Sequence, residues 1–100
     1  MQELVQIGKI ISDINRIKIL GLLLRERELC VCEICDTLEL TQPLVSRHLK
    51  QMREANIVTT KQQGKWMLYS LRENRMINCF LDTIQNEIKN LPNIITCSKE

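Results

Sequence analysis

Three cysteines lie within six residues of one another, at Cys30, Cys32 and Cys35. Thiolates are soft ligands that select soft, thiophilic ions. Arsenic(III) and antimony(III) bind three sulfurs in a pyramid, and their lone pair fills the fourth side, so three cysteines complete such a site. Structural zinc prefers four ligands in a tetrahedron, and this segment offers neither a fourth cysteine nor a histidine. The spacing therefore favours a trivalent metalloid over zinc.

The same spacing shows that an intact helix would keep the three sulfurs apart. Cys32 and Cys35 are i, i+3 neighbours on one helical face. With 3.6 residues per turn, Cys30 lies about 200° around the axis from Cys32 and roughly 140° from Cys35. The sulfurs can meet only if the start of the helix unwinds or Cys30 lies outside it. We therefore expect ligand binding to distort the start of this helix.

Other interpretations of the cysteines stay open. Free cysteines are often small core residues, and Cys79, beside Phe80, fits that role better than a ligand role. Oxidation of Cys35 or Cys79 would instead make a redox or persulfide sensor. Cadmium, lead or zinc would need Cys79, Cys97 or a second chain as additional ligands. A C-x-x-C oxidoreductase requires a βαβ unit, and no such pattern occurs here.

A second group of residues suggests contact with nucleic acid. Residues 41–65 contain five basic residues and one acidic residue, whereas residues 1–40 are net −2 and residues 66–100 are net zero. The whole positive excess of the chain thus lies in one short stretch, as in nucleic-acid-binding domains. The alternative is that these charges only solvate a surface.

The candidate DNA contacts follow from side-chain chemistry. Arginine and lysine pair with guanine, glutamine pairs with adenine, and hydroxyls reach phosphate or base. His48, the only histidine, is either a DNA contact or a partly buried side chain. The candidates are Gln42, Ser46, Arg47, His48, Lys50, Arg53, Lys61 and Lys65.

Apolar periodicity predicts the elements that carry both groups. Helices are expected over residues 2–12, 15–26 and about 31–39. A fourth helix starts after Thr41 with proline in its first turn and ends near Asn56, a residue that tolerates a left-handed cap. Residues 57–62 and 66–71 form a β-hairpin around a glycine-containing loop. A last helix covers residues 77–91 and stops at Pro92.

This order is that of a winged helix-turn-helix, a mainly α fold with a β-hairpin wing (α+β). Helices three and four form the helix-turn-helix. Residues 1–92 are expected to be one DNA-binding and dimerisation domain, and residues 93–100 a flexible tail. A small helical bundle with an added hairpin is the alternative fold.

Length and composition limit the remaining possibilities. One hundred residues make one compact domain. The N-terminal residues lack the basic start and continuous apolar centre of a secretory signal, and no apolar run is long enough to span a bilayer. Five cysteines, three of them clustered, favour reduced thiols in the cytoplasm. No catalytic triad, carboxylate pair or phosphate-binding loop is present, so we expect neither an enzyme nor an organic cofactor.

Several segments together resemble the ArsR/SmtB family of bacterial metal-responsive repressors, over nearly the whole chain. The stretch 28–35 (ELCVCEIC) is similar to the cysteine box of the arsenite-responsive branch. Ser12-Asp13 with Arg16, Ile19 and Leu20 resembles the second helix of the family. The recognition helix corresponds to residues 41–49 (TQPLVSRHL) and the wing to residues 63–66 (QGKW) and 69–71 (YSL).

The resemblance implies a homodimeric repressor that leaves its operator when arsenite or antimonite binds. It also implies that the first and last helices pack across a two-fold axis, so that two recognition helices reach an inverted-repeat operator in double-stranded DNA. The alternative is that the apolar stripes of both helices are buried within one chain. Some relatives bind zinc, nickel or cobalt on the last helix through histidines, and no histidine follows His48 here.

Overall fold

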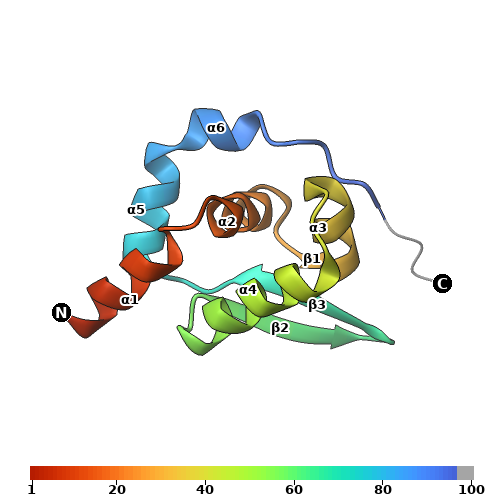
Figure 1. Cartoon of the computed structure of the whole chain (residues 1–100), viewed down its shortest axis with the longest axis horizontal. Coiled ribbons are helices and arrows are strands. Elements are labelled where there is room, and N and C mark those ends of the chain that lie inside the picture. Colours follow the sequence, from red (N-terminus) through yellow and green to blue (C-terminus); the bar gives the residue numbers. More distant parts are fainter. Residues whose placement is uncertain (97–100) are drawn as a thin grey trace.

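The computed structural model describes residues 1–96, which form six helices and three short strands. The second helix lies at the centre, and the other elements surround it (Figure 1). In Figure 1, α2 occupies the middle, α1 and α5 lie at one end, α6 runs along one side, and α4 with the hairpin lies on the opposite side. The elements are α1 (Gln2–Ile10), α2 (Ile14–Glu26), β1 (Leu29–Cys30), α3 (Val31–Leu38), α4 (Gln42–Glu54), β2 (Val58–Gln63), β3 (Trp66–Leu71), α5 (Arg75–Thr83) and α6 (Gln85–Lys89).

Local sequence signals explain where these elements begin and end. Asp13 caps α2, because its carboxylate accepts hydrogen bonds from the backbone N–H of Asn15 at 2.8 Å and of Arg16 at 3.2 Å. Asn56 takes the predicted left-handed conformation (φ 60°) after α4. Gly64 does the same (φ 61°) at the tip of the hairpin.

The sheet contains one strand that the sequence did not predict. Strand order is β1-β3-β2, with both pairings antiparallel. The predicted hairpin runs from the pair Val58–Leu71 to the pair Gln63–Trp66. β1, which lies between the second and third predicted helices, pairs Cys30 with Leu68. The cysteine box is therefore joined directly to the wing.

The core surrounds α2. Three of its side chains, Ile19, Leu20 and Leu22, are completely buried. Helices α3 and α4 contribute Ile34, Val45, Leu49 and Met52, and α5 and α6 contribute Ile77, Leu81 and Ile88. Because α3 and α4 are held by this shared core, the helix-turn-helix has a fixed place on the domain.

The last predicted helix is divided into two. α5 ends at Thr83, and α6 begins after Ile84 and changes direction (Figure 1). The new direction lets α6 pack on α2 at Gly21. A Cβ atom at Gly21 would lie 2.9 Å from Leu91 Cδ1, so the missing side chain permits this close approach.

Residues 93–96 run from α6 to α3. Ile94 packs against the core, and the backbone N–H of Ile95 donates to Thr37 Oγ1 at 2.9 Å. The sequence pattern offered no partner for this segment; the rest of the predicted tail, residues 97–100, lies outside the described residues. Within residues 1–96, no helix combines the length and the apolar character needed to cross a membrane.

Candidate nucleic-acid interface and cysteine site

A tight turn joins α3 to α4. Glu39 ends α3 in the left-handed conformation (φ 56°), and the N–H of Leu40 donates to the carbonyl of Cys35 at 3.0 Å. Thr41 then precedes α4, and Pro43 lies in its first turn, where no backbone donor is needed. Only residues 39–41 therefore separate α3 from α4.

The two faces of α4 differ sharply. Val45, Leu49 and Met52 are fully buried and hold the helix on the domain. The predicted contact residues on the opposite face are exposed: Gln42, Ser46, Arg47, Lys50 and Arg53. An exposed basic face on a helix that is anchored along its other side suits the DNA major groove.

The two predicted wing lysines are exposed as well. Lys65 adjoins Gly64 at the tip of the hairpin. Lys61 Nζ lies 3.6 Å from Glu28 Oε2, an ion pair that joins the wing to the segment after α2. Part of the charge of Lys61 is therefore already balanced within the protein.

His48 points into the protein. Only 5% of its surface is exposed, and its Nε2 lies 3.9 Å from Asp13 Oδ1. Burial lowers the pKa of His48; the Asp13 carboxylate opposes this effect, and the Arg16 guanidinium adds to it. Of the two roles left open by the sequence, the geometry matches the buried side chain, because a residue under the helix does not reach a DNA groove.

Cys30 lies at the boundary between β1 and α3. It is buried, has extended backbone angles (φ −89°, ψ 164°) and is the N-cap of α3. It forms a capping box with Glu33, whose Oε1 accepts the Cys30 N–H at 3.1 Å. Cys30 thus lies just outside the helix, one of the two arrangements that the spacing required.

The other two cysteines occupy different environments. Cys35 is buried, and burial together with the Asp36 carboxylate and nearby Cys30 raises the pKa of its thiol. Cys32 is partly exposed, with its sulfur 3.9 Å from Asp36 Oδ2. Residues 1–96 contain no assembled cluster of three cysteine, histidine or acidic side chains suited to a metal ion.

Cys79 does not take the buried core role that we expected for it. Cys79 is exposed on α5 and borders a hollow of about 760 Å³ between α1 and α5. Cys97 lies outside the described residues.

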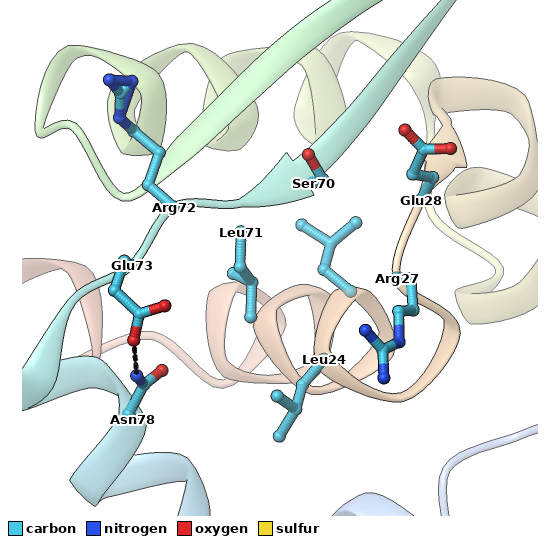
Figure 2. A pocket seen from close by; sticks show the side chains of 9 residues that line it. Leu24, Arg27, Glu28, Ser70, Leu71, Arg72, Glu73 and Asn78 are labelled. Carbon is cyan, nitrogen blue, oxygen red and sulfur yellow. Dashed lines mark hydrogen bonds between the residues drawn. The ribbon is translucent and has the colours of Figure 1, made fainter.

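A further hollow of about 680 Å³ lies between the end of α2 and the β3–α5 connection. Figure 2 shows the guanidinium groups of Arg27 and Arg72 on opposite sides of its leucines, while Asn78 donates to Glu73 at 3.1 Å. None of the predicted site residues lines it. Its polar groups do not converge as they do in a small-molecule site.

Comparison with known proteins agrees with this geometry. Residues 13–60 match the family model described as "Bacterial regulatory protein, arsR family". Over 87 residues, 87% of this chain and 78% of the other, the chain is 34% identical to the arsenical resistance operon repressor of Staphylococcus xylosus. The chain belongs to the arsR family. The resemblance seen in the sequence is confirmed.

Other relatives of this ArsR-family chain are more similar over shorter stretches. It is 48% identical over 63 residues to the arsenic resistance transcriptional regulator ArsR1 of Pseudomonas putida, covering 63% of this chain and 49% of ArsR1. It is 43% identical over 67 residues to the arsenical resistance operon repressor of Escherichia coli, covering 67% and 57%. The chain thus spans about half the length of these two curated relatives.

Solved structures support the winged helix-turn-helix. Reduced HlyU of Vibrio cholerae has a TM-score of 0.76 at 27% identity, covering 86% of this chain and 88% of HlyU. A homodimeric winged helix-turn-helix domain of Mycobacterium bovis has a TM-score of 0.74 at 18% identity, covering 86% and 81%. The predicted fold class is confirmed. The sequence relatives described above are named as a transcriptional regulator and operon repressors, as we expected for a chain without enzyme motifs.

Sequence reasoning missed the side chains that hold α4 from beneath. Arg16 entered only as part of the resemblance, and Gln51 was not singled out. In the structure the Nη1 of Arg16 donates to Gln51 Oε1 at 3.0 Å. Hydrophobic periodicity does not reveal a partner 35 residues away. The available signal was the charge of Arg16 on the mainly apolar helix α2.

Proposed function

We propose that this chain is a homodimeric transcriptional repressor of the cytoplasm that leaves its operator DNA when arsenite or antimonite binds Cys30, Cys32 and Cys35. The observation that carries the proposal is the position of Cys30, which caps α3 immediately before the helix-turn-helix. Relatives named for arsenic resistance support the choice of inducer. A ligand that binds the distorted form more tightly shifts the protein away from the DNA-binding form.

The proposed DNA surface consists of the exposed face of α4 and the wing. Ser46 and Arg47, early in α4, contact bases or phosphates, and the wing lysines contact phosphate or the minor groove. His48 is left out because it is buried. The full set is Gln42, Ser46, Arg47, Lys50, Arg53, Lys61 and Lys65.

The proposed dimer interface is formed by α1 and α5. Leu4 and Val5 on α1 are 56% and 57% exposed, and the hollow beside them reaches Met76 on α5. Covering these side chains with a second chain would remove an apolar surface from water. The related M. bovis domain is homodimeric. Two α4 helices then face an inverted repeat with half-sites about 34–36 Å apart.

Arsenite binds by condensation with the three thiols. Arsenous acid, As(OH)₃, reacts with three thiols to form three As–S bonds and three waters, with no oxidant and no net release of protons. The raised pKa of Cys35 keeps that thiol protonated at neutral pH, which this stoichiometry accommodates. Drawing Cys30 toward the other sulfurs breaks its capping box, at a cost of about 1 kcal/mol.

The DNA surface is tested by single alanine substitutions. The target is a duplex selected by the native protein from a random-sequence library. We expect Arg47→Ala and Lys65→Ala each to weaken binding by about tenfold or more, and the phosphate contacts to reduce the salt dependence. Lys89→Ala is the control, because α6 lies on the opposite side of α2 from α4 (Figure 1). Unchanged affinity in both alanine variants would refute this surface.

Cadmium, lead or zinc is the second candidate inducer, since cadmium regulators named CadC, from Listeria innocua and Lactococcus lactis, are also 34% identical to this chain over 70 residues. Three thiols that bind a divalent ion release their protons, whereas condensation with arsenous acid releases none. Proton release in a weakly buffered, reduced sample therefore separates the two. A redox sensor needs only two sulfurs, so a response that survives in Cys30→Ser would favour that alternative.

A further inference from the structure

The guanidinium of Arg16 holds the end of α1. Its Nε donates to the carbonyl of Ile10 at 2.8 Å, and its Nη2 donates to the carbonyl of Lys9 at 2.8 Å. These are carbonyls of the last turn of α1, which have no partner within the helix. A positive charge at this end of a helix also interacts favourably with the helix dipole.

The other side of the same guanidinium reaches α4. Nη1 donates to Gln51 Oε1 at 3.0 Å and lies 3.4 Å from His48 Nδ1. Arginine has donors only, so this second contact needs the lone pair of Nδ1 and places the ring proton on Nε2. That nitrogen faces Asp13 Oδ1 at 3.9 Å. One side chain of α2 thus joins the end of α1 to the underside of α4.

We propose that Arg16 is a positioning residue that sets the orientation of α4 relative to α1. The inference rests on the proposed function, in which α4 enters DNA and α1 forms the dimer. Because α1 is fixed by the two-fold axis, the angle of α4 on α1 decides the separation of the two recognition helices. The planar fork of arginine spans both sets of partners, whereas the point charge of lysine cannot.

Arg25 provides a matched control on the same helix. Its guanidinium donates to the carbonyls of Leu91 at 2.9 Å and Pro92 at 2.6 Å, after α6. Arg16 and Arg25 therefore both donate hydrogen bonds to the backbone carbonyls at the end of a neighbouring helix. Within residues 1–96, Arg16 but not Arg25 also donates to α4, so replacement of Arg25 reproduces the structural loss without the proposed effect on orientation.

The first experiment measures the spacing preference of DNA binding. Duplexes carry the half-sites selected by the native protein, at the selected spacing or with one base pair added or removed. We expect Arg16→Lys to weaken binding at the selected spacing by about tenfold and at the altered spacings by less than about threefold. Arg25→Lys should keep the native ratio between spacings at a similar loss of Tm. A native ratio in Arg16→Lys would overturn the proposal.

A second experiment needs no DNA and uses the single histidine of the chain. The ring of His48 gives one NMR titration. Removing the positive charge in Arg16→Gln should raise the pKa of His48, and Asp13→Asn should lower it. Arg25→Gln should leave it unchanged. An unchanged pKa in Arg16→Gln would overturn the contact itself.

The two experiments separate the possible failures. A shifted His48 titration with no DNA binding by the native protein would refute the proposed function while the contact with α4 stands.

Gln51→Ala, at an exposed position, keeps the test available if replacement of Arg16 prevents folding. It should reduce the spacing ratio in the same direction by a smaller factor. A full native ratio in Gln51→Ala, with Arg16 variants unfolded, would also count against the proposal.

Discussion

The three cysteines of the cysteine box lie in three different structural environments. Cys30 caps a helix, Cys35 fills part of the core, and Cys32 remains partly exposed. Burial keeps the thiol of Cys35 protonated to higher pH. Cys32 is thus the least buried of the three cysteines. In the proposed function, Cys30 and Cys35 reach a shared ion only when the start of α3 opens.

Protonation of His48 should make the fold less stable in mild acid. Burial lowers the pKa of His48 below its usual 6.5, so the unfolded chain takes up a proton at a higher pH than the folded one. Stability then falls as pH decreases from about 7 through the folded-state pKa. Asp13, whose pKa is lowered, loses its contribution only below its usual 3.8.

Urea unfolding at pH 7.5 and pH 5.5 measures this effect. The native protein should lose more free energy of unfolding between these two pH values than His48→Gln does. Asp13, Arg16, Arg47 and Gln51 are the groups that act on the ring, and all of them remain in the variant. An identical pH dependence in both proteins would contradict the buried, neutral state of His48.

Side-chain chemistry and local spacing are enough to predict which side of α4 is exposed. The exposed basic face of α4 follows from a helical period that places Val45, Leu49 and Met52 on one side. The polar neighbours of His48, Asp13 and Arg16, are more than 30 residues away in the sequence. Long-range polar contacts of this kind leave no trace in periodicity, so the sequence left the role of His48 open.

Among the elements, β1 links the cysteine box to DNA binding by a second route. Cys30 pairs with Leu68, and Leu29 pairs with Tyr69, on the inner strand of the hairpin. A ligand that pulls Cys30 out of its capping box also pulls on this pairing. The wing and α4 thus both adjoin the segment that the proposed inducer distorts.

Hydrogen exchange can detect this route. Arsenite should speed amide exchange at residues 29–31 and at Leu68 and Tyr69, because a two-residue strand has few other bonds to hold it. The distal hairpin pair Gln62–Met67 is the internal control and should change little. Unchanged protection in β1 with arsenite bound would show that ligand binding leaves the start of α3 intact.

The elements that the sequence predicted are those with strong local signals. Caps, the proline after Thr41 and the glycine in the hairpin located the helix-turn-helix and the wing to within about two residues. The two-residue β1 has no pattern of its own, because only its pairing with β3 defines it. No helix-breaking residue marks the division between α5 and α6 at Ile84, and the segment after it packs closely on Gly21.

At the scale of the whole molecule, α6 and the segment after it enclose α2 and end on α3. The guanidinium of Arg25 holds the end of α6, and Thr37 accepts the N–H of Ile95. Leu4 and Val5 of α1 stay exposed in this arrangement, and Leu4 borders the hollow that Met76 of α5 also lines. The proposed dimer would use that surface.

A charge placed on this surface should disrupt the dimer. Leu4→Glu replaces a side chain that is 56% exposed in the single chain, so the fold of each chain should be retained. We expect weaker dimerisation by about tenfold or more, because the carboxylate would be buried without a partner. Sedimentation equilibrium measures the change, with Gln2→Glu as a charge control. A dimer unaffected by Leu4→Glu would place the interface elsewhere.

The measurement that tests the central claim most directly is operator binding under reducing conditions during titration with arsenite. It compares the native protein with Cys32→Ser, since Cys32 is the least buried of the three proposed ligands. We predict that arsenite releases the native protein from DNA, whereas the variant stays bound at the same concentrations. Continued binding of the native protein in arsenite, or equal release of both proteins, would contradict an arsenite-released repressor that acts through its cysteine box.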